Sequence, residues 1–344
     1  MKSMIELQKR LLPDLLSIIQ KRFHILQYIG AMEPVGRRSL AATLGYTERV
    51  LRSEVEFLKE QKLLYSTSAG MSLTEDGREL IQKLEDFMRE LSGLDEMEKQ
   101  LKSLLDINKI FIVPGDSDVL TWIKNELGKT CVECINKLLK GKHIIAVTGG
   151  STMATVAEMM TPQSNNHDFL FVPARGGIGE EVKNQANTIC STMAERTRSR
   201  HRVLYVPDQV SDEMYHSMIK EPEIHEVLNL IRSADMVLHG IGDAMTMATR
   251  RKTAPDILAK LQQSEAVGEA FGYYFNEAGE VVHKVQTIGL QLSDLQSAEH
   301  VIAVAGGSSK AKAIGAYMKQ APPSTILITD EGAASELLKG NPTL

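Results

Sequence analysis

Apolar residues recur at helical spacing through the first quarter of the chain. The helical pattern is interrupted at Pro34-Val35-Gly36 and again at Gly45-Tyr46. Ser39 and Thr47 stand where N-caps are expected, so the sequence predicts a short helix after Ser39 and a longer helix after Thr47. Two short apolar runs on either side of residues 68–70 then predict a small β-hairpin. This order of elements is that of a winged helix-turn-helix.

The second of these helices is polar at its beginning and has an apolar face. The residues that we expect this face to bury are Val50, Leu51, Val55 and Leu58. A recognition helix carries polar side chains at its N-terminal end, and arginine suits both guanine and phosphate. The candidate DNA-binding residues are Arg37, Arg38, Ser39, Thr47, Glu48, Arg49 and Arg52. A solvated face balanced by Glu54, Glu56 and Glu60 is the alternative, but those acids lie further along the helix, so the segregated charge favours DNA binding.

From residue 109 onward, short apolar runs alternate with helical stretches. The runs lie at residues 110–113, 144–147, 169–172, 203–206, 236–238, 301–304 and 325–328. Such an alternation is typical of a parallel sheet that is covered on both faces. The sequence therefore predicts an α/β protein, with a winged helix-turn-helix domain over residues 1–90 and a doubly wound, Rossmann-like domain over 109–344. An amphipathic linker helix that packs or self-associates is expected over 91–108.

Composition places limits on the function. The chain has 344 residues, 43% of them hydrophobic, which is enough for two full cores, and its net charge of -5 gives no global sign of nucleic-acid binding. No apolar run is long enough to span a membrane and no signal peptide is recognisable, so we expect a cytoplasmic protein without a membrane partner. Cys131 and Cys134 share one face of a predicted helix, and no further residue has zinc-ligand spacing. We therefore expect buried thiols and no metal site.

A glycine-rich loop follows the predicted strand at residues 144–147. Its sequence is Thr148-Gly149-Gly150-Ser151-Thr152, and it opens a helix. Glycines let the backbone approach a ligand, while hydroxyls and the free N–H groups of a helix N-terminus suit one phosphate. The loop matches neither G-x-G-x-x-G nor a Walker motif, so ATP and dinucleotides are poorly supported. A simple strand-to-helix turn is the alternative interpretation.

Other predicted strand ends carry related features. Ala305-Gly306-Gly307-Ser308-Ser309-Lys310 repeats the glycine–hydroxyl pattern with a lysine, and Arg175 lies between a strand and two glycines. Arg250 and Arg251 follow the loop His239-Gly240-Ile241-Gly242. Because the carboxyl ends of parallel strands meet at one edge of a sheet, these groups are expected to surround one pocket. Several cations there suit a small molecule with phosphates at two places.

Over nearly its whole length the chain resembles the SorC-type sugar-responsive regulators of bacteria. Long strings carry the resemblance, among them Gly36-Arg37-Arg38-Ser39-Leu40, Phe171-Val172-Pro173-Ala174-Arg175-Gly176-Gly177 and Glu269-Ala270-Phe271-Gly272-Tyr273-Tyr274-Phe275. The resemblance implies a repressor of the genes for the triose-phosphate part of glycolysis. It also implies fructose 1,6-bisphosphate as the inducer, no other cofactor, and an effector domain similar to sugar-phosphate isomerases and glucosamine-6-phosphate deaminase.

The same resemblance assigns roles by motif. One phosphate would lie on Gly149, Gly150, Ser151, Thr152 and Lys310, and Ser309 completes that expected set. The other phosphate would meet Arg175, Gln185 and Arg250, with Glu269 on a sugar hydroxyl. Operator DNA is read in two-fold related half-sites, so a homodimer or homotetramer is expected.

An isomerase or deaminase with a fused helical domain is the main alternative. Such an enzyme needs a positioned base and a proton shuttle. The deaminase-like enzymes supply these groups from an Asp-Gly-His sequence, whereas here Gly242 is followed by Asp243-Ala244-Met245-Thr246 without a histidine. Helix capping explains Asp243 at least as well as catalysis, and His239 is expected to be structural. The sequence therefore predicts a sensor rather than an enzyme.

Overall fold

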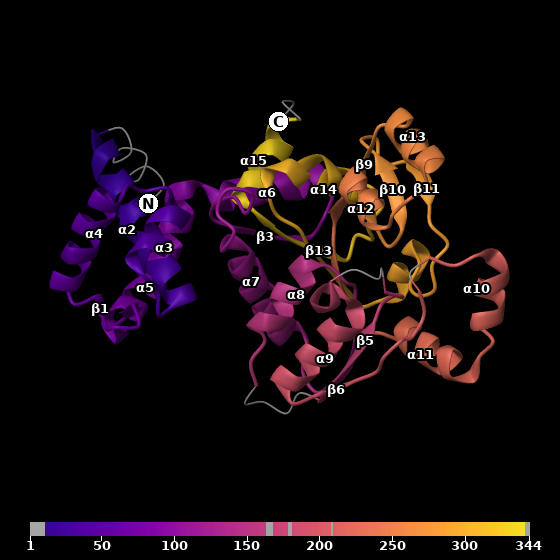
Figure 1. The fold of residues 1–344 in the computed structure, drawn as a ribbon. Helices are drawn as coiled ribbons and strands as arrows, with labels where there is room; N and C mark the ends of the chain where they lie inside the picture. Colours follow the sequence, from indigo (N-terminus) through magenta and orange to yellow (C-terminus); the bar gives the residue numbers. More distant parts are fainter. Residues whose placement is uncertain (1–10, 163–167, 178–180, 208, 341–344) are drawn as a thin grey trace. The chain divides into compact units, whose positions relative to one another are not determined.

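The computed structural model describes residues 11–162, 168–177, 181–207 and 209–340 (Figure 1). The chain divides into two compact units, of which the first ends at Glu96 and the second begins at Met97. This division falls within α6 (Leu94–Leu105). Gly93, with φ of 71°, ends the preceding α5 (Glu75–Ser92) in a left-handed conformation. The helix expected over 91–108 is therefore α6, and it begins only after Gly93.

The first unit has the predicted winged helix-turn-helix order. Its further described elements are α2 (Pro13–Met32), α3 (Arg37–Leu44), α4 (Glu48–Glu60), β1 (Leu64–Ser66) and β2 (Met71–Leu73). β1 and β2 pair in antiparallel fashion to form the wing. Val35 forms a bridge with Met71, which ties the segment before α3 to the wing.

Two local predictions in this unit were wrong. Ser39 does not cap α3, because the helix begins at Arg37 and the extended Gly36 is its N-cap, so Ser39 lies inside the first turn. Val50 is 41% exposed, whereas Leu51, Val55 and Leu58 are buried as expected. The buried face of α4 follows the spacing i, i+3, i+4, i+7 from Leu51, and Glu54 occupies the i+3 position on it.

Thr47 caps α4 as predicted. Its hydroxyl oxygen accepts a hydrogen bond from the Val50 N–H at 3.3 Å. Gly45 precedes it in a left-handed conformation, with φ of 68°, which produces the tight turn between α3 and α4. The two helices of the motif are thus joined by the local signals that the sequence contains.

The second unit is built on a seven-stranded parallel sheet, as predicted. Its strands are β3 (Lys109–Val113), β4 (Lys142–Val147), β5 (Asp168–Pro173), β6 (Arg200–His201), β7 (Met236–Gly240), β12 (His300–Val304) and β13 (Thr325–Asp330). They lie in the order β3-β13-β12-β7-β4-β5-β6, and every neighbouring pair is parallel. From β4 the chain winds outward to β5 and β6, and from β7 it winds the other way to β12 and β13. The winding therefore reverses between the neighbouring strands β4 and β7.

Helices and short connecting segments surround this sheet (Figure 1). The α-helices are α7 (Ile123–Leu138), α8 (Ser151–Met159), α9 (Ala186–Thr197), α10 (Asp212–Met218), α11 (Pro222–Arg232), α12 (Ala244–Arg250), α13 (Pro255–Gln263), α14 (Ala311–Met318) and α15 (Glu331–Lys339). Three 3-10 turns are η1 (Val182–Asn184), η2 (Leu292–Ser297) and η3 (Ser308–Lys310). The main core lies between the sheet and α7, α8 and α9. All six residues of β13 are buried, as expected for a strand covered on both faces.

The structure adds a second sheet that the sequence pattern did not predict. It consists of β8 (Gly242–Asp243), β9 (Ala266–Ala270), β10 (Tyr273–Asn276) and β11 (Val281–Lys284), joined in the antiparallel order β11-β10-β9-β8. Figure 1 shows it in orange beside α12 and α13. Conversely, the strand predicted at 203–206 is irregular, because the N–H and C=O groups of Leu204 bond to the side-chain amide of Asn187 and not to a neighbouring strand.

Cys131 and Cys134 are buried on α7, which confirms the expected buried thiols. Burial raises the pKa of both thiols, and the neighbouring Cys134 adds to the effect on Cys131. A thiolate is therefore disfavoured at both positions. Separately, none of the helices formed by the described residues has both the length and the apolar character needed to cross a membrane.

Candidate functional site: a polar pocket at the reversal of the sheet and an arginine-rich surface on the first unit

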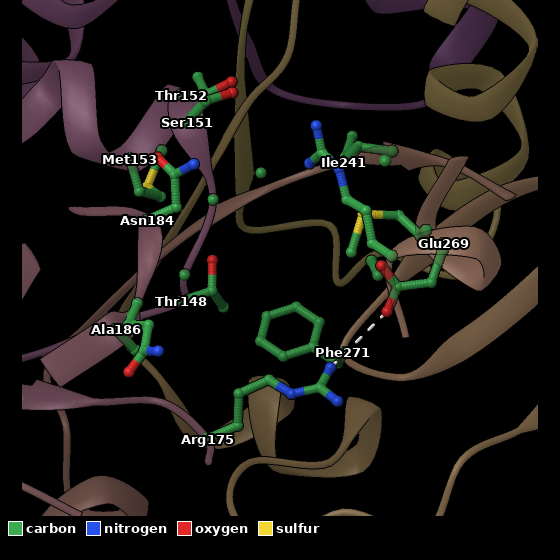
Figure 2. Close-up of a pocket in the computed structure, with 18 of the residues that line it drawn as sticks. Thr148, Ser151, Thr152, Met153, Arg175, Asn184, Ala186, Ile241, Glu269 and Phe271 are labelled. Atoms are coloured by element: carbon green, nitrogen blue, oxygen red, sulfur yellow. Dashed lines mark ion pairs between the residues drawn. The ribbon is translucent and has the colours of Figure 1, made fainter. Parts of the chain in front are cut away.

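A pocket opens at the carboxyl ends of β4 and β7, where the winding of the sheet reverses (Figure 2). Open α/β sheets bind their ligands at this place. Every predicted effector-binding residue except Ser309 lines it, namely Gly149, Gly150, Ser151, Thr152, Arg175, Gln185, Arg250, Glu269 and Lys310. The structure thus brings together residues that lie up to 161 positions apart in the sequence, from Gly149 to Lys310.

The loop after β4 depends on its two glycines. Gly150 has φ of 121°, and its N–H donates to the Asn184 carbonyl oxygen at 2.8 Å. A Cβ on Gly149 would lie only 2.8 Å from the same oxygen. α8 then starts at Ser151 without a side-chain cap, so the N–H groups of its first turn remain available to an anion in the pocket.

The second glycine–hydroxyl loop has a different role from the one expected. Carboxylates occupy its amides: the Gly307 N–H donates to Asp330 at 2.7 Å, the Ser308 N–H to Asp116 at 3.2 Å, and the Ser309 N–H to Asp118 at 2.8 Å. A phosphate would have to displace these carboxylates. Ser309 accordingly lies outside the pocket lining, and only the side chain of Lys310 extends from this loop into it.

Lys310 and Arg250 form a cationic side of the pocket. Burial lowers the pKa of Lys310, the positive charges of Lys124 and Arg250 lower it further, and Asp118 and Asp330 oppose the change. The charge of Arg250 therefore reaches Lys310, and both side chains line the pocket together with Arg175. An anion bound here would relieve the repulsion between the two cations.

Glu269 lies at another side of the pocket, between two arginines. Glu269 is 4% exposed, and its Oε1 lies 2.9 Å from Nη2 of Arg251 and 3.6 Å from Nη1 of Arg175. Figure 2 shows the Arg175 guanidinium directed at this carboxylate, with the Phe271 ring beside both. Arg251 was expected near the pocket but was not assigned a role in ligand binding. The sequence shows two adjacent arginines after the Gly240–Gly242 loop but does not indicate that Arg251 pairs with Glu269.

A strained turn fixes the Phe271 ring in the pocket wall. Phe271 and Gly272 connect β9 to β10 with φ of 55° and 83°, the two positive values that a two-residue hairpin of type I′ needs. The Glu269 carboxylate accepts the Gly272 N–H at 2.6 Å, and the Phe271 ring packs on His239 with centroids 4.8 Å apart. Such strain in a residue other than glycine is held in place by its surroundings, as is common at binding sites.

His239 and Asp243 have the structural roles that were predicted. His239 is fully buried, with its ring nitrogens 3.0 Å from the Gly240 carbonyl oxygen and 3.0 Å from the Tyr317 hydroxyl. Burial lowers the pKa of His239 to about 4, so the ring is neutral. Asp243 accepts hydrogen bonds from the N–H and the hydroxyl of Thr246 and so caps α12. The two groups that an enzyme could have used as a base are therefore engaged in the fold.

The predicted DNA-binding residues form one exposed surface of the first unit. Arg37, Arg38, Ser39, Thr47, Glu48, Arg49 and Arg52 are all exposed. A shallow groove is lined by all of them except Thr47, together with Gly36 and Leu51. We call this the arginine groove.

Glu54 does not neutralise the arginine groove. It lies on the buried face of α4 and pairs with Lys21 at 2.5 Å and Arg22 at 2.8 Å. Its negative charge is therefore compensated inside the unit, while the four arginines of the groove share it with a single acid, Glu48. This excess of positive charge fits a polyanion.

Known proteins resemble both units. The family model "CggR N-terminal DNA binding domain" matches residues 18–88, and the model "Putative sugar-binding domain" matches residues 89–339. The central glycolytic genes regulators of Priestia megaterium and Bacillus subtilis are 60% and 57% identical to the chain, each alignment covering 98% of it and 99% of the relative. A crystal structure of a SorC family transcriptional regulator from Enterococcus faecalis is 49% identical, with a TM-score of 0.67, and covers 71% of this chain and 99% of that one.

The family matches agree with the geometry of both sites. The DNA-binding model contains the whole arginine groove, and the sugar-binding model contains the whole lining of the pocket. The chain therefore belongs to the family of central glycolytic genes regulators, DNA-binding proteins of the SorC type with a sugar-binding domain.

Proposed function

We propose that this chain represses glycolytic genes and that fructose 1,6-bisphosphate releases it from operator DNA. The names of its relatives support the target genes, and the pocket at the reversal of the sheet supports the ligand. The observation that carries the proposal is the pairing of an uncapped helix N-terminus with a buried Glu269 in one pocket. The first feature suits a phosphate and the second suits a hydroxyl.

The charge of the pocket fits a sugar phosphate. Four cationic side chains, Arg175, Arg250, Arg251 and Lys310, line it together with two acidic ones, Glu181 and Glu269, which leaves an excess of two positive charges. A phosphate on the first turn of α8 would also meet the charges of Lys310 and Arg250. Charge-assisted hydrogen bonds of this kind are the strongest that a pocket without metal can offer.

Operator release requires two states with different sugar affinity. The arginine groove would read the two halves of a two-fold symmetric operator in the cytoplasm, which requires a homodimer or homotetramer. Sugar bisphosphate would bind more tightly to the state that binds the operator poorly. Because binding free energies are linked, operator DNA must lower the affinity for the sugar by the same factor as the sugar lowers the affinity for DNA.

The experiment has two stages. Operator fragments are first selected from random DNA with the ligand-free protein, and their release is then followed by fluorescence anisotropy during titration with fructose 1,6-bisphosphate, fructose 6-phosphate or glucosamine 6-phosphate. We expect the bisphosphate to be the most effective. Release by a monophosphate alone would replace the proposed inducer, and conversion of any of these compounds would indicate an enzyme.

Arg250→Ala tests whether this pocket is the inducer site. The variant should need at least about 10-fold more bisphosphate for release, because a charge-assisted bond contributes roughly 1.5–3 kcal/mol. Its operator affinity without ligand should be unchanged. Arg202→Ala is the matched control, because Arg202 is exposed, pairs with Glu226 and does not line the pocket. Equal sensitivity of both variants to the bisphosphate would contradict the assignment.

A further inference from the structure

The two oxygens of the Glu269 carboxylate have different surroundings. Oε1 accepts the Gly272 N–H at 2.6 Å and an N–H of Arg251 at 2.9 Å, and Arg175 lies 3.6 Å from it. No donor from the described part of the chain bonds to Oε2. A Cβ built on Gly242 would lie 3.6 Å from Oε2, and Gly242 lines the pocket, so this oxygen is on the pocket side.

Arg251 fixes the Glu269 carboxylate by hydrogen bonding. One of its nitrogens donates to Glu269, and the other donates to the Tyr274 hydroxyl at 3.1 Å. The side chain of Arg251 is only 3% exposed, and Tyr274 is fully buried in the apolar cluster formed by α12, α13 and the small sheet. The guanidinium is therefore held by hydrogen bonds on two of its nitrogens, one to the carboxylate and one to a buried hydroxyl.

Fixing Oε1 has a consequence for the ligand. Arg251 and Arg175 place two positive charges beside the buried Glu269 carboxylate. A carboxylate oxygen that faces the pocket accepts hydrogen bonds but repels phosphate oxygens. Glu269 therefore favours a hydroxyl at its side of the pocket and disfavours a second anion there.

We propose that Arg251 is a positioning residue that makes the pocket selective for hydroxylated phosphates. It holds Glu269 by Oε1, and Oε2 accepts a hydrogen bond from a sugar hydroxyl. Although Arg251 lines the pocket, its guanidinium donates to Glu269 and Tyr274, and in this proposal it acts on the ligand through Glu269. This inference rests on the proposed function, in which the pocket binds a phosphorylated sugar, and it adds the residue that sets selectivity between molecules of equal charge.

Two bisphosphates separate hydroxyl recognition from phosphate recognition. Fructose 1,6-bisphosphate carries ring hydroxyls, whereas hexane-1,6-diol bisphosphate carries the same two phosphates on a six-carbon chain without any. Isothermal titration calorimetry of the full chain and of Arg251→Met with each compound gives four dissociation constants. We expect Arg251→Met to weaken binding of the sugar bisphosphate by about 10- to 100-fold, the range for a hydrogen bond to a charged group. Binding of the diol bisphosphate should change by less than about 3-fold.

Further variants distinguish positioning from general damage. Tyr274→Phe keeps the buried ring and removes only the hydroxyl that orients Arg251. It should therefore also weaken binding of fructose 1,6-bisphosphate relative to binding of the diol bisphosphate, by a smaller factor than Arg251→Met does. Arg251→Lys keeps a cation near Glu269 and should restore part of the selectivity. Equal weakening of both bisphosphates by Arg251→Met and by Tyr274→Phe would overturn the proposal. Failure of the unaltered chain to bind either bisphosphate would instead overturn the proposed function.

Discussion

Substitution of Gly149 by alanine tests whether the loop after β4 is the phosphate site. The added Cβ would lie 2.8 Å from the Asn184 carbonyl oxygen, which is about 0.6 Å closer than ordinary contact, and 3.4 Å from the Ala186 nitrogen. Both neighbours are backbone atoms, one in the last residue of η1 and one in the first residue of α9, so neither can rotate away as a side chain would. The loop must therefore move, and the Gly150 N–H loses its 2.8 Å bond to Asn184.

The magnitude follows from these contacts. Overpacking of this kind typically costs about 1–3 kcal/mol of unfolding free energy. In a unit of this size, each kcal/mol corresponds to a Tm decrease of about 2–4 °C. Displacement of the α8 N-terminus should also remove at least one charge-assisted bond to the ligand, which raises the Kd for fructose 1,6-bisphosphate by about 10- to 100-fold.

Gly240→Ala is the matched control. Gly240 also lines the pocket, but a Cβ there would meet only the Val304 carbonyl oxygen at 3.8 Å, an ordinary contact. Differential scanning calorimetry gives the Tm of each variant, and calorimetric titration gives the Kd. Wild-type sugar affinity in Gly149→Ala, together with a lowered Tm, would show that the loop is a structural turn and that phosphate binds elsewhere.

Three further predictions concern DNA binding and pH. Arg52→Ala should weaken operator binding and reduce the salt dependence of log Kd by about one unit if Arg52 contacts a phosphate, as a salt titration of operator affinity will show. Burial alone would raise the pKa of Glu54, but bonds and charges from Lys21 and Arg22 outweigh it and hold the pKa below 4.5. The contribution of Glu54 to the free energy of unfolding is therefore fully present above pH 4.5 and is lost as the pH falls below it. Acid unfolding of Glu54→Gln should lack this loss of stability. Burial lowers the pKa of His239 from 6.5 to about 4. The free energy of unfolding should therefore decrease as the pH falls from 6.5 to about 4, because the unfolded chain binds a proton that the buried ring does not. Urea unfolding of His239→Gln should lack this dependence on pH.

The sequence was sufficient to predict the location of the pocket. Continuous apolar runs identify buried parallel strands, and such strands place their carboxyl ends at one edge. Gly149, Arg175 and Lys310 each follow a run of this kind, so local pattern and topology together bring them into one pocket. The cap at Thr47 and the turn at Gly45 were likewise predictable, because both depend only on residues within a few positions.

Pairings between distant residues were not predictable. Arg250 and Arg251 are adjacent in the sequence, yet Arg250 acts on Lys310 whereas Arg251 bonds to Glu269 and Tyr274. The small sheet that supplies Glu269 consists of strands of two to five residues with mixed burial, too short for a clear alternating pattern. The sequence therefore indicates which charges are near the pocket but not which of them a ligand can reach.

The two glycine–hydroxyl loops show why the motif alone does not determine function. Each follows a buried strand and opens a helix, and in each the second glycine has a positive φ, 121° at Gly150 and 102° at Gly307. What differs is whether the exposed amides already have partners. Asp116 and Asp118, about 190 residues away in the sequence, and Asp330 bind the amides of the second loop, whereas α8 has no side-chain cap.

An amide that already donates to a carboxylate helps to hold the fold, whereas an amide without a side-chain cap beside cations can donate to an anionic ligand. This difference supports the proposed phosphate site on the first loop, whereas the second loop contributes only Lys310 to the pocket lining. It also implies that Asp118→Asn, which keeps an acceptor for the Ser309 N–H but removes a negative charge near Lys310, should strengthen binding of the sugar bisphosphate. Weaker binding in that variant would mean that the hydrogen bond between Asp118 and the second loop, and not the charge balance of the pocket, limits the affinity.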